Sequence, residues 1–168
     1  MKTKRKLKTG TKILIVFFVF ILVVIGAFLV YVSDYYRADD LAIEAASLGE
    51  GIDISCTNGA LVFDPGNADT ALIFYPGGKV EYLAYEPLMI AIARQGILCI
   101  LPKMPFNLAV FDMNAADTYI SDYPEILHWY LGGHSLGGSM AASYTSKNID
   151  NVEGLVLLAS YSTADMSS

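Results

Sequence analysis

The sequence predicts an α/β protein with a mostly parallel sheet, opened by an antiparallel β-hairpin and preceded by a single transmembrane helix. Three observations support this prediction. Short apolar runs alternate with runs of helical periodicity after residue 60, as in parallel strands joined by helices. Two strand-like runs flank the turn residues Asn58 and Gly59. Residues 13–32 form an apolar segment without a single charged side chain.

The apolar segment of residues 13–32 has the length of a membrane anchor. Its twenty residues span about 30 Å as a helix, which matches the hydrocarbon core of a bilayer. A cleaved signal peptide is the alternative, but its apolar region is usually about 7–15 residues long and ends in a small-residue cleavage site. No such site follows residue 32. We therefore expect an uncleaved anchor.

The charges on either side of this segment predict its orientation. Residues 1–12 carry six of the 11 basic side chains, whereas all 17 acidic residues follow the segment. The positive-inside rule therefore predicts a cytoplasmic N-terminus and an extracytoplasmic remainder, held to the cell membrane by a single pass. The acidic excess of residues 33–168 argues against nucleic acid and anionic lipid surfaces as partners.

Residues 33–49 are expected to form a polar juxtamembrane connector with helical character, and residues 50–168 the α/β domain. The domain is predicted to contain six strands, which correspond to residues 52–59, 60–65, 70–75, 97–102, 128–133 and 154–160. Helical patterns separate them, at residues 82–96, 114–126 and 139–148, and the segment 104–112 reads as a loop that enters a helix.

The two cysteines, Cys56 and Cys99, both lie in apolar strand-like runs. We interpret them as buried free thiols, with a disulfide as the alternative in an oxidising compartment. The histidines and cysteines do not have the spacing of metal ligands, so the sequence predicts neither a metal nor another cofactor.

The stretch Gly133-His134-Ser135-Leu136-Gly137 fits the pattern G-x-S-x-G between a predicted strand and a predicted helix. A sharp turn at that junction lifts a serine hydroxyl above the sheet, and small neighbours relieve the crowding. Ser135 is therefore the candidate nucleophile. The alternative is a glycine-rich turn that only packs tightly.

A serine nucleophile also needs hydrogen-bond donors for the oxyanion that develops on its substrate. The backbone N–H of Leu136, at the start of the next helix, is one candidate. The loop Tyr75–Val80 contains two glycines that let backbone N–H groups approach a substrate closely. A simple strand-ending turn is the alternative for this loop.

The motifs YPGGKVE (75–81) and GGHSLGG (132–138) occur in this order and are separated by strand–helix–strand units. With them, residues 50–168 resemble the α/β-hydrolases, specifically the small membrane-anchored bacterial type related to dienelactone hydrolases and carboxylesterases. The resemblance implies Ser135 as nucleophile, backbone oxyanion donors at Leu136, Gly78 and Lys79, and a triad completed by an acid and then a histidine in chain order.

The chain departs from this family in its histidines. His128 lies seven residues before Ser135, which is about 23 Å along a strand. His134 is adjacent to Ser135, and successive side chains point in different directions. Neither is expected to be the base, and Asp165 is interpreted as part of a polar tail. The triad acid and base are expected beyond Ser168, so we interpret the domain as incomplete at its C-terminus.

The function predicted from these motifs is a membrane-anchored serine hydrolase that cleaves an ester or related acyl bond of a small-molecule substrate. The alternative is a non-catalytic binding module that keeps the glycine-rich turn as scaffold. Four residues that follow strands are candidates either for an acyl pocket or for core packing: Tyr82, Tyr85, Phe106 and Asn107. Neither the identity of the substrate nor the oligomeric state follows from the sequence.

Overall fold

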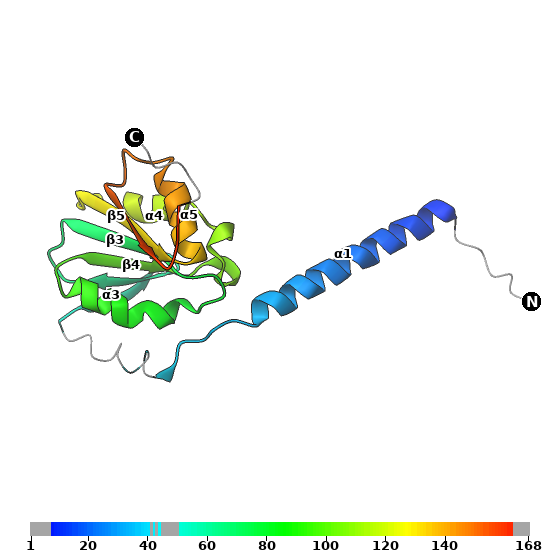
Figure 1. The fold of residues 1–168 in the computed structure, drawn as a ribbon, viewed down its shortest axis with the longest axis horizontal. Coiled ribbons are helices and arrows are strands. Elements are labelled where there is room, and N and C mark those ends of the chain that lie inside the picture. Colours follow the sequence, from blue (N-terminus) through cyan, green and yellow to red (C-terminus); the bar gives the residue numbers. More distant parts are fainter. Residues whose placement is uncertain (1–7, 41, 43, 45–50, 163–168) are drawn as a thin grey trace, which may run out of the picture. The chain divides into compact units, whose positions relative to one another are not determined.

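A computed structural model describes residues 8–40, 42, 44 and 51–162, so Asp165 lies outside the described residues (Figure 1). The chain forms two compact units, Met1–Asp34 and Tyr35–Ser168. In the first unit, the helix α1 (Thr9–Ser33) contains the whole predicted segment 13–32. This helix is long and apolar enough to cross a membrane. Most of its large apolar side chains are exposed.

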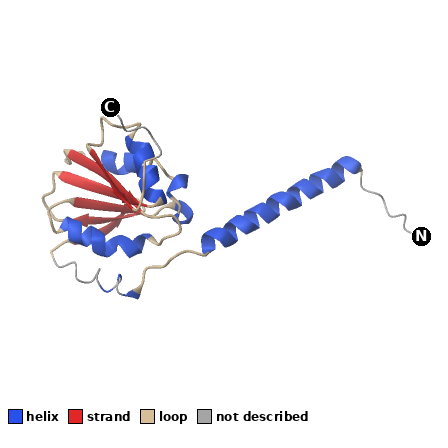
Figure 2. Cartoon of the chain, in the orientation of Figure 1, coloured by secondary structure: helices blue, strands red, loops and turns tan. Residues whose placement is uncertain are grey.

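The second unit is built on one six-stranded sheet (Figure 2). The strands are β1 (Asp53–Thr57), β2 (Ala60–Asp64), β3 (Thr70–Tyr75), β4 (Leu98–Pro102), β5 (His128–His134) and β6 (Gly154–Leu158). Their order across the sheet is β1-β2-β4-β3-β5-β6, with antiparallel pairing around β2 and parallel pairing from β4 to β6. The predicted fold class, an α/β domain with a mostly parallel sheet, is confirmed.

The hairpin β1–β2 turns at Asn58 and Gly59. Both residues have positive φ, 49° and 76°, and the flanking Thr57 and Ala60 are paired. This is the backbone that an Asn-Gly hairpin turn requires. The prediction for Cys56 is wrong: its side chain on the edge strand β1 is exposed, whereas Cys99 on β4 is buried. Both thiols are free in the structure.

Helices cover both faces of the sheet (Figure 1). The helix α3 (Glu86–Ala93) packs with Leu72 and Phe74 of β3 on one face. The helices α4 (Ala115–Asp122) and α5 (Leu136–Thr145) pack on the other face with Ile73 and Tyr75. Since alternate residues of β3 enter opposite layers, its continuous apolar sequence corresponds to a strand buried on both sides.

The segment after β4 differs from the prediction. Instead of entering a helix, residues 104–112 form two short 3₁₀ turns, Pro105–Asn107 and Ala109–Phe111, and Phe106 and Asn107 have positive φ. A continuous helix cannot include two such residues.

The boundaries of the three predicted helices also differ from their expected positions, and α4 ends at Asp122 rather than at residue 126. The helix predicted at 82–96 is a 3₁₀ turn, Tyr82–Tyr85, followed by α3. The helix α5 begins at Leu136, the start expected for it as the source of an oxyanion donor, so Gly137 and Gly138 belong to it and precede the periodic run 139–148.

The connector is not helical next to α1. Tyr36 instead forms an isolated parallel bridge with Val80, and among the described connector residues helical conformation begins further on, at Asp40, Ala42 and Glu44. The reason is that both backbone groups of Tyr36 have partners in a loop of the domain: its N–H donates to Lys79 O, and its carbonyl accepts from Glu81 N–H.

Candidate active site

Ser135 lies between the last residue of β5 and the first residue of α5, and its side chain is exposed. Its backbone has φ 50° and ψ −121°, a conformation that costs a non-glycine residue about 1–3 kcal/mol. Three backbone contacts hold it there. Its N–H donates to Leu158 O at 3.0 Å, and its carbonyl accepts from Ser139 N–H at 3.1 Å and from Ser160 Oγ at 2.7 Å. The strained turn is therefore supported by α5 and by the chain that follows β6.

The glycines around Ser135 allow close backbone packing. A Cβ atom at Gly133 would lie 2.6 Å from the backbone of both Gly137 and Gly138. A Cβ atom at Gly137 would collide with the carbonyl oxygens of Tyr75 and Pro76. The two glycine motifs therefore pack directly against each other, although about 60 residues separate them in the sequence.

The amides of the loop after β3 have different partners. Gly77 N–H donates to the Tyr85 hydroxyl at 3.0 Å, and Lys79 N–H donates to Asn107 O at 2.8 Å. Gly78 N–H has no hydrogen-bond partner within the described part of the chain. Of the two donors that the resemblance implies here, Lys79 is already engaged, so the geometry corrects that expectation and leaves Gly78.

Gly78 lies against the start of α5. A Cβ atom on it would be 2.9 Å from Leu136 Cδ2. The N–H of Leu136 is in the first turn of α5, where no helical carbonyl precedes it, and it too has no partner among residues 8–40, 42, 44 and 51–162. Within the described residues, two amides without a partner therefore lie on neighbouring segments at the start of α5, one of them in the residue that follows Ser135.

His134 is held by Tyr85 rather than by Ser135. The Tyr85 hydroxyl lies 2.8 Å from His134 Nδ1, and the two rings are in tilted contact with 5.9 Å between their centroids. Burial raises the pKa of Tyr85, and the Gly77 N–H that its hydroxyl accepts lowers it in part. The hydroxyl is therefore neutral at physiological pH and bridges the loop after β3 to the turn at Ser135.

His128 lies at the opposite end of β5 from Ser135. Its exposed ring pairs with Glu153, with 2.7 Å between Nδ1 and Oε1. The hydrogen bond to that carboxylate, and then its charge, raise the pKa of His128. Neither histidine of the chain contacts the Ser135 hydroxyl, which has no hydrogen-bond partner among the residues that the structure describes.

Tyr75, the last residue of β3, holds the end of that strand in place. Its fully buried hydroxyl donates to Met113 O at 2.9 Å and accepts from Ala116 N–H at 3.0 Å. Burial raises the pKa of this phenol well above its ordinary value. The side chain therefore fixes the strand end, from which the Pro76-Gly77-Gly78 loop starts, to the beginning of α4.

A pocket of about 260 Å³ opens at Ser135. Its lining residues come from the turn, from α5 and from the segment after β6: Ser135, Leu136, Ser139, Ala159, Ser160 and Tyr161. The contribution of Ser139 and Ser160, whose hydroxyls lie 3.3 Å apart, was not predicted from the sequence. Serines carry no periodic signal, and these two approach each other only when β6 pairs with β5.

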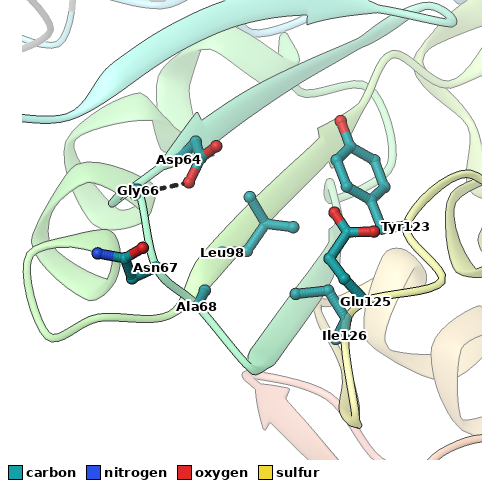
Figure 3. A pocket seen from close by; sticks show the side chains of 8 residues that line it. All are labelled: Asp64, Gly66, Asn67, Ala68, Leu98, Tyr123, Glu125 and Ile126. Atoms are coloured by element: carbon teal, nitrogen blue, oxygen red, sulfur yellow. Dashed lines mark hydrogen bonds between the residues drawn. The ribbon is translucent and has the colours of Figure 1, made fainter.

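Another pocket, of about 250 Å³, lies at the other end of the parallel strands (Figure 3). It is formed by Asp64 at the end of β2, Leu98 at the start of β4 and the loop before β5, and the Asp64 carboxylate there accepts from Gly66 N–H. Its position excludes it from any reaction at Ser135. Among the described residues, no group of three or more histidine, cysteine or acidic side chains could hold a metal ion.

The candidate pocket residues have different environments. Tyr82 and Tyr85 are half-buried at the edge of the α3 layer. Phe106 is half exposed, and Asn107 contributes its carbonyl to the loop after β3. Of these four residues, Tyr85 is the one that contacts the turn at Ser135, through His134.

Comparison with known proteins agrees with this architecture. Residues 71–168 match the family described as "Alpha/beta hydrolase family". A bacterial heroin esterase is similar to the chain with a TM-score of 0.54 and 20% identity, over 67% of this chain and 46% of that one. A hormone-sensitive lipase from a metagenome library has a TM-score of 0.50 and 16% identity, over 73% and 51%. The chain thus spans about half the length of these structures. No curated protein matches it.

Proposed function

Because the chain belongs to the alpha/beta hydrolase family, we propose that it is a serine hydrolase that cleaves an ester or a related acyl bond through an acyl-enzyme at Ser135. The observation that carries this proposal is the backbone at Ser135. A strained positive φ is kept at an exposed serine, between a parallel strand and a helix, beside two amides that have no partner within the described residues. Strain of this kind persists where the surrounding structure maintains it, and it clusters at active sites.

The proposed reaction begins with attack by Ser135 Oγ on the acyl carbon of the substrate. The carbonyl oxygen becomes an oxyanion, which accepts hydrogen bonds from the N–H groups of Leu136 and Gly78. The general base takes the proton of the Ser135 hydroxyl during the attack. Collapse of the intermediate expels the alcohol, which receives this proton from the base, and leaves the acyl group on Ser135. Water then attacks the acyl-enzyme, and the acid leaves as Ser135 regains its proton.

The general base of this reaction is neither His128 nor His134. His128 is at the far end of β5, and the Nδ1 atom of His134 bonds to Tyr85. In the resembled family the acid and base follow the nucleophile in chain order, and we propose the same order here. Without a base, the oxyanion donors and substrate binding alone give about 10³- to 10⁴-fold acceleration over water.

The same histidine geometry favours a second candidate function. A domain that keeps the turn at Ser135 without a base would bind an acyl compound without cleaving it, as a non-catalytic module. Both candidates take a small-molecule acyl ligand. For both candidate functions, we propose that α1 anchors the protein in the cell membrane and that the domain lies outside the cytoplasm. The length and apolar character of α1 support the anchor, and the charge asymmetry around α1 supports the orientation.

Labelling of the full-length native protein with a fluorophosphonate probe tests the proposal. We expect one labelled serine, and Ser135→Ala should abolish the signal. The matched control is Ser139→Ala, which removes an α5 hydroxyl that lines the same pocket and should leave labelling intact. A folded protein that is not labelled would contradict catalysis and favour the binding module.

A further inference from the structure

The connector after α1 is bonded to the loop that carries the candidate oxyanion donor. Tyr36 N–H donates to Lys79 O at 2.8 Å, and Glu81 N–H donates to Tyr36 O at 2.8 Å. The Glu81 carboxylate also accepts from Ala38 N–H at 2.9 Å. Residues 36–38 therefore lie along residues 79–81, next to Gly78.

The covalent chain limits how far this loop can be from the end of α1. Two residues separate Ser33, the last residue of α1, from Tyr36, and the three Cα-to-Cα steps between them span at most about 11 Å. The covalent tether from α1 to the residue that pairs with the loop 77–81 is therefore short, whatever the direction of α1. The tyrosines and the arginine of this short segment, Tyr35, Tyr36 and Arg37, are residue types that favour the membrane–water interface.

Large apolar side chains are exposed beside the same loop. Phe106, Val110 and Phe111 are 50%, 47% and 51% exposed, and Tyr36 is 76% exposed. The Phe106 and Phe111 rings contact each other edge to face, with 5.6 Å between their centroids. The hydrogen bond from Lys79 N–H to Asn107 O joins this segment to the loop after β3. We call these four residues the apolar rim.

We propose that the apolar rim inserts into the surface of the bilayer that holds α1, and that the site at Ser135 takes its substrate, an amphiphilic acyl ester, directly from that bilayer. This inference rests on the proposed function for its substrate, while the docking itself does not depend on catalysis. Burial of apolar side chains in lipid supplies the attraction. Since residues 33–168 are strongly acidic, a neutral lipid surface suits the domain better than an anionic one.

Fluorescence quenching tests the docking without any requirement for activity. The full-length protein, in a Cys56→Ser background, is reconstituted into phosphatidylcholine vesicles and labelled with bimane at Phe111→Cys. The matched control carries the label at Leu127→Cys, another highly exposed apolar position, just before β5. Nitroxide lipids should quench the label at position 111 and leave the label at position 127 unaffected. The proposed docking would be overturned if the label at position 111 were not quenched, or if the labels at both positions were quenched equally.

Enzyme assays in the same vesicles test the source of the substrate. A flexible insert of about twelve Gly and Ser residues between Asp34 and Tyr35 lets the domain move about 20 Å from the membrane. Hydrolysis of a long-chain ester that resides in the bilayer should fall by about tenfold, because the effective concentration of the surface falls with tether length. Hydrolysis of a water-soluble short-chain ester should not change.

The two failures are distinguishable. An unchanged rate on the bilayer ester in the protein with the insert would overturn this inference and leave the serine hydrolase standing. If the protein without the insert showed neither activity and no Ser135 labelling, the proposed function would be overturned, and the quenching result would still decide whether the rim docks on lipid.

Discussion

A single hydroxyl, that of Tyr85, links three parts of the candidate site. The hydroxyl accepts a hydrogen bond from Gly77 N–H and lies within hydrogen-bond distance of His134 Nδ1. The centroid of the Tyr85 ring lies 5.3 Å from that of the Phe74 ring. If the hydroxyl were absent, a partly buried amide and a ring nitrogen would lose their partners together. Tyr85 is therefore a positioning residue for the loop after β3, and it acts through Gly77 rather than on a substrate.

The variant Tyr85→Phe is expected to lower kcat by about tenfold and to leave KM nearly unchanged, because an unsatisfied polar group costs about 1–3 kcal/mol and loosens the loop that carries Gly78. Steady-state kinetics of ester hydrolysis by the full-length protein measure both constants. The matched control is Tyr82→Phe, one turn earlier, where the ring stays in place over Lys103. A change in KM alone would contradict the positioning role.

His128 makes part of the stability pH-dependent. The Glu153 hydrogen bond raises its pKa, so the pair stabilises the fold below the ordinary histidine pKa, and this contribution is lost as the pH rises through the raised value. His128→Gln should therefore lower Tm at about pH 5.5 and leave it unchanged at about pH 9. Thermal unfolding monitored by circular dichroism measures the difference. An equal deficit at both pH values would indicate a packing effect instead.

The close approach of α5 to the end of β3 depends on glycine. The backbone of Gly137 lies against the carbonyl groups of Tyr75 and Pro76, which cannot rotate away as a side chain can. The helix N-terminus can then lie near the loop, with the amides of Leu136 and Gly78 on neighbouring segments. The spacing of the candidate oxyanion donors is therefore a consequence of how one helix packs on one strand.

Gly137→Ala is expected to destabilise the domain by about 1–3 kcal/mol or more, because added volume against backbone is poorly accommodated. It should also lower activity by separating α5 from the loop. Chemical denaturation in detergent measures the stability. Gly26→Ala is the matched control, since nothing lies within 4 Å of the Cβ atom that it would add to α1. Equal stability of the two variants would contradict this account of the packing.

In the whole molecule, α1 is long and apolar enough to cross a membrane. The cysteines can test the predicted orientation, with the N-terminus in the cytoplasm and the domain outside it. Cys56 is exposed on β1, whereas burial raises the pKa of Cys99 to about 12 and keeps its thiol protonated. A membrane-impermeant maleimide added to intact cells should therefore label the protein at Cys56.

Cys56→Ser should abolish this labelling, and Cys99→Ser should not affect it. The readout is a mass shift of the protein after the cells are washed and lysed. Labelling that requires prior permeabilisation of the cells would place the domain in the cytoplasm and contradict the predicted orientation.

The elements that were predictable are those that depend on local patterns. The Asn58-Gly59 turn needs positive φ at both positions, and the apolar run of β3 needs two covered faces, so each was identified from a few neighbouring residues. The Ser135 turn was identified in the same way, because its glycines relieve a local clash. The segment 104–112 was not, since its turns depend on the bond between Asn107 and Lys79, which are remote in sequence.

The sequence alone established the order of the elements, the apolar helix and the motif around Ser135, because periodicity, length and turn chemistry are properties of contiguous residues. The tertiary structure decided the strand order, the engagement of Lys79 N–H by Asn107, the attachment of His134 to Tyr85, and the pairing of Tyr36 with the loop at Lys79. Each of these depends on backbone groups of distant segments that become partners only when the sheet assembles. No local pattern encodes that pairing, because any backbone N–H can donate to any carbonyl that the fold brings within reach.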